Sequence, residues 1–309
     1  MNTTEATNRM EGQRVPILVY HHVYPDGTPE SEHGDGAGIV RESEFQRHLH
    51  YMVEEGWTVV STSQIVDWLT EGEALPKKAA ALHFDNGWLD TATVVLPILS
   101  RLGMIATCFP ITDGIEAASE GKSTSVRTLT EGVIEKPFMN WDQAQLLLDV
   151  GWEIGAHTAT HCKMADQYAL ESDEAILREV QVSNDAFKKH LGSVPEHFAY
   201  PSGSHNVSTD RLLSLYYRSL RLWHFEWPIT WTYTHFKSSP LALECQNIDM
   251  RVSFDDFTHI FSEAFGLDEG SYDRRTQPYV DGNGKKRNPK TKGRGSGRGR
   301  SGCAVPEDG

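Results

Sequence analysis

Two histidines four residues apart, His157 and His161, form the strongest chemical signal in the sequence. They directly follow residues 153–156, an apolar segment that predicts a strand. If the chain turns into a helix there, side chains at positions i and i+4 lie on one face, and both imidazoles can reach one divalent metal ion. A hydrolytic metal site needs such neutral nitrogen ligands, an oxygen ligand and an open position for water. The spacing therefore predicts a metal site, and the adjacent Cys162 is interpreted as a small buried thiol rather than a ligand.

An acidic side chain lies at the end of another apolar run. Residues 80–84 predict a strand, and Asp85, Asn86 and Gly87 follow it directly. A carboxylate at that place can act as a general base on a water molecule, and Gly87 lets the backbone approach a substrate closely. A plain Asp-Asn-Gly turn is the alternative interpretation.

Two further strand ends carry polar residues. Residues 16–23 contain the pair His21 and His22, and because side chains alternate along a strand, one of the two is expected to face a reacting centre. Residues 198–203 contain a Tyr-Pro-Ser-Gly segment that begins at Tyr200. Proline fixes the turn there and leaves nearby backbone N–H groups free to bind a developing oxyanion. A simple structural turn is equally compatible with this segment.

The elements that must position these residues follow an alternating pattern. Between residues 15 and 266, short apolar runs alternate with segments of helical periodicity, as in α/β proteins. The predicted strands are 17–20, 58–60, 80–84, 105–109, 153–156, 197–200, 219–222 and 244–250. The predicted helices are 42–55, 62–70, 90–102, 141–150, 170–190, 207–217 and 254–265.

Seven or eight β-α units in about 250 residues predict either a TIM-like barrel or an open doubly wound sheet. No glycine-rich phosphate-binding motif follows a strand, so nucleotide binding has no support and the barrel is favoured. In a parallel barrel the carboxyl ends of the strands converge on one face, which would bring the polar strand ends together. Residues 25–40 and 112–136 are too polar and irregular for the scaffold and are expected to form loops.

The charge of the chain is unevenly distributed. The net charge is -14, but residues 271–309 carry a net +6, which leaves -20 for the remainder. A body this acidic would repel phosphates, so we expect the folded domain to bind no nucleic acid. The domain boundaries that follow are a flexible N-terminus over 1–14, a folded domain over 15–267, and a disordered, basic, glycine-rich tail over 268–309.

No apolar run is long enough to span a membrane, and the N-terminus lacks the apolar stretch of a secretory signal. The sequence therefore predicts a cytoplasmic protein with no membrane span. Its 4 cysteines are scattered, with no CxxC pair, which favours reduced thiols over a disulfide scaffold.

Taken together, the polar segments resemble those of the NodB-type polysaccharide deacetylases, over roughly residues 15–265. HFDNG (83–87) is similar to the TFDDG motif of that family, HTATH (157–161) matches its H-[ST]-x-x-H motif, and FAYPSG (198–203) is similar to its third motif. The opening PILVYHHV (16–23) resembles the branch that acts on poly-β-1,6-N-acetylglucosamine.

The resemblance implies a distorted (β/α)7 TIM-like barrel that binds a divalent metal ion, Zn2+ first and Co2+ or Ni2+ as alternatives. Its site consists of a base, an acid, an oxyanion-binding backbone group and three metal ligands. Carried over by motif, these are Asp85, His21, the backbone at Tyr200, and Asn86, His157 and His161.

The sequence departs from the family pattern in three places. Asn86 replaces the usual metal-binding aspartate, and a neutral amide oxygen is a poorer partner for a cation than a carboxylate. The arginine that many members carry just before the proline of the third motif is absent, because Ala199 and Tyr200 occupy that stretch. The fourth motif, which usually contains Asp-Trp, has a loose counterpart in Glu226 and Trp227.

The sequence therefore predicts a metal-dependent hydrolase that removes N-acetyl groups from a polysaccharide or oligosaccharide containing N-acetylglucosamine. Two alternatives stay open: a hydrolase of small cyclic or linear amides on the same fold, and a carbohydrate-binding pseudoenzyme. The sequence does not determine the oligomeric state.

Overall fold

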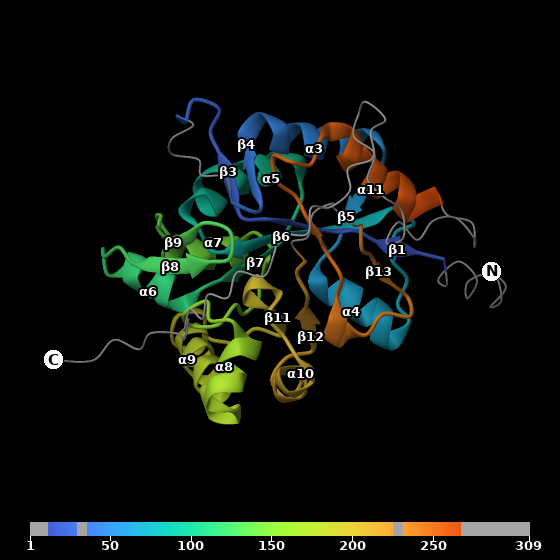
Figure 1. Ribbon diagram of the computed structural model, residues 1–309. Coiled ribbons are helices and arrows are strands. Elements are labelled where there is room, and N and C mark those ends of the chain that lie inside the picture. The colour runs from blue at the N-terminus through green and yellow to red at the C-terminus, as the bar shows by residue number, and fades with distance from the viewer. Residues whose placement is uncertain (1–11, 30–35, 225–230, 267–309) are drawn as a thin grey trace, which may run out of the picture.

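The computed structural model describes residues 12–29, 36–224 and 231–266 (Figure 1). Three sequence predictions concern residues that lie mostly or wholly outside these ranges: the flexible N-terminus, the basic tail over 268–309, and the Glu226 and Trp227 counterpart of the fourth motif. These three stay predictions.

Parallel strands arranged in a ring form the centre of the molecule. The largest sheet has the order β10-β7-β6-β2-β14, all parallel, and β11 and β12 form a second parallel pair. Parallel bridges between Ala156 and Phe198 and between Arg221 and Leu243 continue this order, so that the chain leading into β14 closes the ring. The strands are β2 (Ile17–Tyr20), β6 (Ala79–Asn86), β7 (Thr107–Pro110), β10 (Glu153–Ile154), β11 (His197–Ala199), β12 (Ser219–Arg221) and β14 (Gln246–Asn247).

This arrangement confirms the distorted (β/α)7 barrel. The strands are short, and most of their residues are buried, as expected when helices cover the outer face of a parallel sheet. The distortion lies where single bridges replace a ladder, on either side of the β11–β12 pair.

Inward-pointing residues fill the barrel in layers. At the amino ends of the strands, the Thr107 hydroxyl donates to Glu153 Oε2 (3.2 Å), and the His197 ring contacts the Ser219 hydroxyl (2.9 Å). The backbone amide of Thr62, at the start of a helix, donates to the same Glu153 carboxylate (2.8 Å). Because side chains repeat every two residues along a strand, the next layer contains Asp85, Phe109, Gly155 and Arg221. Of these four residues, Asp85 lines the candidate site.

The helices lie outside the ring (Figure 1). Two predicted helix starts have full capping boxes, at Ser61 with Gln64 and at Asn140 with Gln143, which satisfy backbone donors at the helix N-terminus. The last helix packs beside the first, where the Tyr51 ring contacts Phe257 and Phe261. The helices are α3 (Glu42–Glu54), α4 (Thr62–Glu71), α5 (Leu96–Leu102), α6 (Thr112–Ser119), α7 (Trp141–Asp149), α8 (Met164–Glu171), α9 (Asp173–Leu191), α10 (Val207–Leu213) and α11 (Phe254–Gly266).

The remaining elements are short strands and helical turns beside the barrel. They comprise two antiparallel pairs, a parallel pair beside the site, an edge strand on β6 and three non-α helical turns. The strands are β1 (Arg14–Val15), β3 (His22–Tyr24), β4 (Ile39–Arg41), β5 (Thr58–Val59), β8 (Ser125–Thr128), β9 (Gly132–Glu135) and β13 (Thr234–His235). The turns are η1 (Thr91–Val95), η2 (Pro201–Gly203) and η3 (Pro240–Ala242).

The expectation that residues 112–136 form a loop is wrong. The segment contains α6 and the β8–β9 hairpin, which pack on a small apolar cluster of their own. The members of this cluster are Trp88, Ile111, Val126 and Phe138, with Ala118 and Ile134 against them. The cluster provides the burial that a mostly polar segment needs to order.

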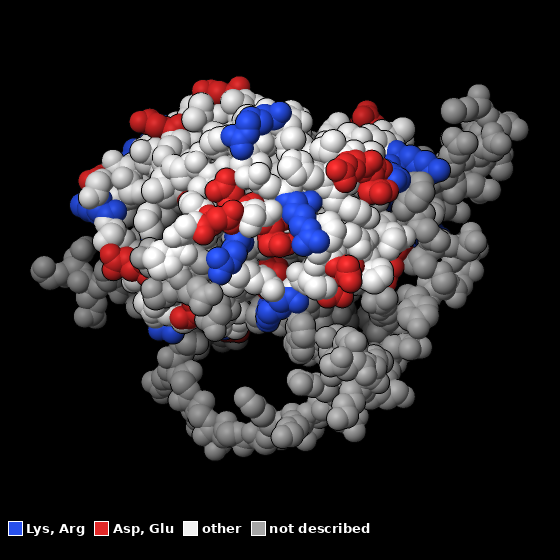
Figure 2. Space-filling view, turned by 90° about the horizontal axis from the view of Figure 1, so that it is seen from above, with Lys and Arg blue, Asp and Glu red and all other residues white. Residues whose placement is uncertain are grey.

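The surface carries both signs of charge. In Figure 2, acidic and basic side chains lie interspersed on the face seen from above Figure 1, without a continuous basic area. No helix in the described ranges is both long and apolar enough to cross a bilayer. The described cysteines, Cys108, Cys162 and Cys245, are buried, and no disulfide joins them to one another.

Candidate active site

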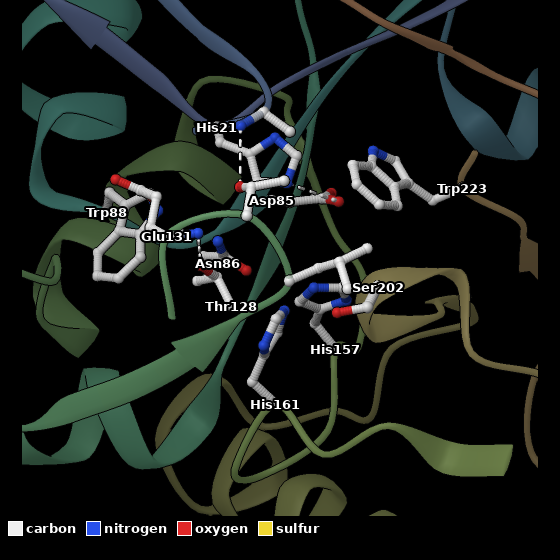
Figure 3. A pocket seen from close by; sticks show the side chains of 13 residues that line it. His21, Asp85, Asn86, Trp88, Thr128, Glu131, His157, His161, Ser202 and Trp223 are labelled. Carbon is white, nitrogen blue, oxygen red and sulfur yellow. Dashed lines mark hydrogen bonds and ion pairs between the residues drawn. The ribbon is translucent and has the colours of Figure 1, made fainter. Parts of the chain in front are cut away.

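A pocket lies at the carboxyl ends of the barrel strands and brings together residues that are far apart in the sequence (Figure 3). Five of the six predicted site residues line it, and Tyr200 does not. The lining consists of His21, Ala37, Asp85, Asn86, Trp88, Thr128, Leu129, Thr130, Glu131, His157, His161, Ser202 and Trp223.

Asp85 forms a buried ion pair with Arg221. The side chains are 3% and 1% exposed, and Arg221 Nη2 lies 2.6 Å from Asp85 Oδ1 and 2.5 Å from Oδ2. Burial alone would raise the pKa of the carboxyl, but Arg221, His157 and His21 outweigh it, and the pKa is lowered to about 2. Asp85 is therefore ionised and held in a fixed orientation, the state that a general base requires.

His21 and His22 face opposite ways, as alternation along a strand requires. His21 lines the pocket with Nε2 3.8 Å from Asp85 Oδ2, and burial lowers its pKa to about 4 although Asp85 opposes this. Its ring lies so close to Gly38 that a Cβ there would be 2.0 Å from His21 Nδ1. His22 instead contacts Asp90 through Nδ1 (2.9 Å) and stacks on neighbouring aromatic rings. The structure thus places His21, and not His22, at the pocket.

His157 and His161 are held by backbone carbonyl groups. His157 Nδ1 donates to Ala199 O and His161 Nδ1 donates to Arg127 O, each at 2.8 Å. Burial lowers the pKa of both rings, so they are neutral near pH 7. With the proton on Nδ1, each Nε2 keeps its lone pair, the arrangement found in histidines that bind metal ions. The ring centroids are 5.0 Å apart.

The helix expected over these histidines does not form. Thr158 and His161 have positive φ angles of 67° and 65°, which interrupt a right-handed helix, and α8 begins only at Met164. The Thr158 hydroxyl accepts the His161 amide (2.9 Å), and the Glu179 carboxylate accepts the Thr160 amide (3.1 Å). A turn fixed by side chains therefore brings the two rings together instead.

Asn86 supplies an oxygen beside these imidazoles. Its Oδ1 is buried and has no hydrogen-bond partner among the described residues, a costly state for a polar atom. The φ angle of Asn86 is 73°. The Ile111 amide holds this conformation by donating to Asn86 O (3.0 Å), and the next residue, Gly87, packs on Pro110. No three His, Cys, Asp or Glu side chains among the described residues are placed to bind a metal ion together, so a third ligand here would have to be an amide. Two imidazole nitrogens and an orphaned amide oxygen nevertheless fit a divalent cation.

The chain also matches a known family. A family model described as polysaccharide deacetylase matches residues 72–218, which contain both the Asp85 and the His157 segments. The match to this family covers slightly less than half of the chain.

The relatives that the chain matches are distant. It is 21% identical over 196 residues to the Bacillus subtilis (strain 168) protein YxkH, a match that covers 63% of this chain and 59% of that one. It is 29% identical over 106 residues to the poly-beta-1,6-N-acetyl-D-glucosamine N-deacetylase of Escherichia coli (strain K12), covering 34% and 15% of the two chains. The chain thus spans less than two thirds of the length of either relative.

Solved structures share the fold. A de-N-acetylase from Aggregatibacter actinomycetemcomitans superposes with a TM-score of 0.67 at 19% identity, covering 80% of this chain and 99% of that one. The Streptococcus pyogenes deacetylase PplD, solved in complex with acetate, gives a TM-score of 0.65 at 23% identity, covering 80% and 98%. At these identities the likeness concerns the barrel alone.

Arg221 is the site residue that sequence reasoning missed. Many members of the polysaccharide deacetylase family carry an arginine before the proline of the third motif, and here Ala199 and Tyr200 occupy that stretch of β11. Arg221 reaches Asp85 from β12, the strand that pairs with β11, and Ala199 and Arg221 are register partners. The available signal was a lone arginine between Leu220 and Leu222 in a predicted strand.

Tyr200 differs from its predicted role. Its amide donates to Arg221 O (3.1 Å) as part of strand pairing, and its hydroxyl donates to Asp210 Oδ1 (2.6 Å). Neither group is left for an oxyanion. Ser202, two residues further on, lines the pocket instead and has a φ of 55°, a conformation that non-glycine residues rarely adopt.

Proposed function

We propose that this protein is a metal-dependent hydrolase that removes N-acetyl groups from N-acetylglucosamine-containing polysaccharides or oligosaccharides. The observation that carries the proposal is the pocket itself, where an ionised carboxylate, an imidazole and a set of metal-binding groups meet. The name of the Escherichia coli relative supports the choice of an N-acetylglucosamine polymer.

The metal ligands in this proposal are Asn86, His157 and His161. Imidazole nitrogens suit Zn2+ best, with Co2+ and Ni2+ as alternatives, and the single amide oxygen in place of a carboxylate predicts weaker binding. A divalent cation bound there would polarise the acetyl carbonyl and lower the pKa of a water molecule.

Asp85 and His21 move the proton in this proposal. Asp85 accepts a proton from the attacking water, and Arg221 holds the carboxylate in place while it does so. His21 Nε2, 3.8 Å from Asp85 Oδ2, delivers a proton to the departing amine. Because burial keeps His21 neutral at pH 7, the proton that it delivers is the one that Asp85 takes from water.

The pocket also offers walls for a sugar. Trp88 and Trp223 line it, and the Trp223 indole N–H donates to Asn247 Oδ1 (3.2 Å), which fixes that ring. Trp223 provides apolar contact area for the acetyl methyl group or the sugar ring, whereas Trp88 is 1% exposed and already packs against His22 and Phe138. Trp141, by contrast, is a core residue whose ring stacks on His190.

Acetate release tests the proposed function. The purified chain should release acetate from β-1,6-linked and β-1,4-linked N-acetylglucosamine oligomers when Zn2+, Co2+ or Ni2+ is added, and chelation should abolish release. Hydrolysis of cyclic ureides or imides with no acetate release would instead favour a small-amide hydrolase. Binding of the oligomers without any hydrolysis, at saturating metal, would favour a carbohydrate-binding pseudoenzyme.

The metal ligands can be tested without an activity assay. The His157→Ala/His161→Ala variant should bind no Zn2+ in calorimetric titration, because two of three ligands are gone. Asn86→Asp should tighten binding by about 1–3 kcal/mol, the scale of a charge-assisted contact.

The matched control removes two exposed histidines, His50 and His259, and should leave Zn2+ binding unchanged. Full Zn2+ occupancy in the His157→Ala/His161→Ala variant would place the metal elsewhere. Unchanged affinity in Asn86→Asp would show that residue 86 does not face it.

A further inference from the structure

The residues that carry the two proposed metal-binding imidazoles form a turn with a rare backbone conformation. Thr158 and His161 have positive φ angles of 67° and 65°, a region that residues with a Cβ mostly avoid because the side chain crowds the backbone. A conformation of this kind persists only where the surrounding structure holds it. The contacts of residues 157–161 with the rest of the protein therefore determine where His157 and His161 point.

Two helices hold the backbone of this turn. At the start of α6, the Asp113 amide donates to Ala159 O (3.1 Å). From α9, Glu179 Oε2 accepts the amides of Ala159 (3.0 Å) and Thr160 (3.1 Å), and Glu179 Oε1 accepts the Thr160 hydroxyl (2.9 Å). One carboxylate thus satisfies three donors of the turn, at the two residues that lie between the positive φ angles.

The rings are anchored by other elements. His157 Nδ1 donates to Ala199 O in β11, and His161 Nδ1 donates to Arg127 O in β8. The ring centroids are 5.0 Å apart, and Figure 3 shows the two rings next to each other at the pocket. These two hydrogen bonds fix how each ring is rotated, whereas the separation of the rings also depends on the backbone that joins them. Glu179 bonds to that backbone and to neither ring.

Ion pairing does not account for the position of Glu179. Among the described residues, none of the ion pairs of α9 involves it. A second carboxyl group, that of Asp113, lies close by, and burial together with the charges of Glu179 and Glu116 raises the pKa of Asp113 to about 6. A carboxylate beside another acidic group is unfavourable unless hydrogen-bond donors surround it. The donors around Glu179 are those of the turn over residues 157–161.

We propose that Glu179 is a positioning residue of the metal site, which holds residues 157–161 in the conformation that directs both imidazoles at one ion. This role rests on the proposed function, because it concerns the same metal ion. Groups that orient metal ligands from outside commonly change metal affinity by about 10- to 100-fold when they are removed. Without Glu179 the turn loses three hydrogen bonds, so the imidazoles are no longer held at a fixed separation before the ion binds.

The Zn2+ affinity of the chelator-treated chain tests this role. In calorimetric titration, Glu179→Ala should bind Zn2+ about 10- to 100-fold more weakly than the unaltered chain. Glu179→Gln should retain most of the affinity, because its amide oxygen can accept the two backbone amides and its amide nitrogen can donate to the Thr160 hydroxyl. A loss in Glu179→Gln as large as that in Glu179→Ala would show that Glu179 acts through its charge, and would overturn the proposal.

Two further variants serve as matched controls. Glu174→Ala removes an exposed carboxylate from the same helix. Tyr217→Phe removes the hydrogen bond from the Tyr217 hydroxyl to Asn184 Oδ1 (3.0 Å), which loosens the attachment of α9 without a change at the turn. Both should bind Zn2+ as tightly as the unaltered chain. A loss of affinity in Tyr217→Phe equal to that in Glu179→Ala would attribute the effect to the packing of α9 and would overturn the proposal.

Hydrogen exchange of the chelator-treated chain shows whether the turn itself responds. The amides of Ala159 and Thr160 should exchange faster in Glu179→Ala, because their acceptor is gone, and should be little changed in the two controls. Unchanged Zn2+ affinity in Glu179→Ala would overturn the proposal and leave the proposed function intact. An unaltered chain that neither binds Zn2+ nor releases acetate would overturn the proposed function, and the positioning role with it.

Discussion

Replacing Arg221 with methionine is expected to destabilise the protein by about 3–5 kcal/mol, the scale seen when one partner of a buried ion pair is removed. The variant leaves the Asp85 carboxylate buried without its guanidinium partner. It also removes the contacts that Arg221 makes with Cys245 Sγ (3.5 Å) and over the Phe109 ring (5.2 Å). Urea denaturation followed by tryptophan fluorescence measures the loss.

Arg218 provides the matched control. It lies one residue before β12, is 40% exposed, and pairs with Glu196 and Asp67 at the surface. Arg218→Met should cost about 1 kcal/mol or less, as exposed ion pairs do. Equal losses for the two methionine variants would contradict the structural role given to Arg221.

The Asp85–Arg221 ion pair also determines how the Asp85→Asn variant must be interpreted. A neutral amide in place of the carboxylate would leave Arg221 as an unpaired buried cation, so Asp85→Asn should lose stability as well as about 100-fold or more of kcat. The Asp85→Asn/Arg221→Met double variant should lose less stability than the two single variants added together, because their losses share one interaction. Activity of Asp85→Asn therefore has to be compared at a temperature where the variant is folded.

The strand ends could be predicted from the sequence because each is a local pattern. An apolar run that ends abruptly in Asp85 and Asn86, or in His21, is visible in a few residues, and the barrel brings such ends to one face. The family resemblance then assigned catalytic and metal-binding roles to these residues. The strand over 17–20 has the predicted boundaries, and the boundaries of most other strands differ by one or two residues. The last strand, expected over 244–250, pairs only at Gln246–Asn247.

The conformation of residues 157–161 could not be predicted in this way. The i and i+4 spacing suggested a helix, and nothing local to the spacing signals the positive φ angles at Thr158 and His161. Those angles depend on Glu179, which lies in α9 and accepts the amides of Ala159 and Thr160. A long-range contact therefore decided a local conformation, although the metal-binding interpretation does not depend on the helix.

Arg221 and the β8–β9 hairpin were missed for the same physical reason. An ion pair across 136 residues of sequence has no periodicity to reveal it. The hairpin has few apolar residues, and its order depends on Trp88 and Phe138 from outside it. Both features arise from tertiary packing, and both bear directly on the proposed chemistry.

The largest expected effect on catalysis without loss of the metal comes from His21. His21→Ala should lower kcat by about 100- to 10,000-fold, the range for removing a general acid, while Zn2+ binding measured by calorimetry stays unchanged. The reason is its place in the pocket, with Nε2 3.8 Å from the carboxylate that takes the proton from water. Steady-state acetate release on an N-acetylglucosamine oligomer measures the loss.

His22→Ala is the matched control, because His22 is the next residue in the chain and is buried, but faces away from the pocket. Its loss removes the contact with Asp90 and the stacking on Tyr24 and Trp88, so it should lower stability and leave most of kcat. The two variants separate a proton donor from a packing residue, since a purely structural role for His21 would lower stability in both and kcat in neither. If His22→Ala lost more kcat than His21→Ala, the acid would be His22. The reaction would then take place on the side of the strand that His22 faces, opposite to the pocket that His21 lines.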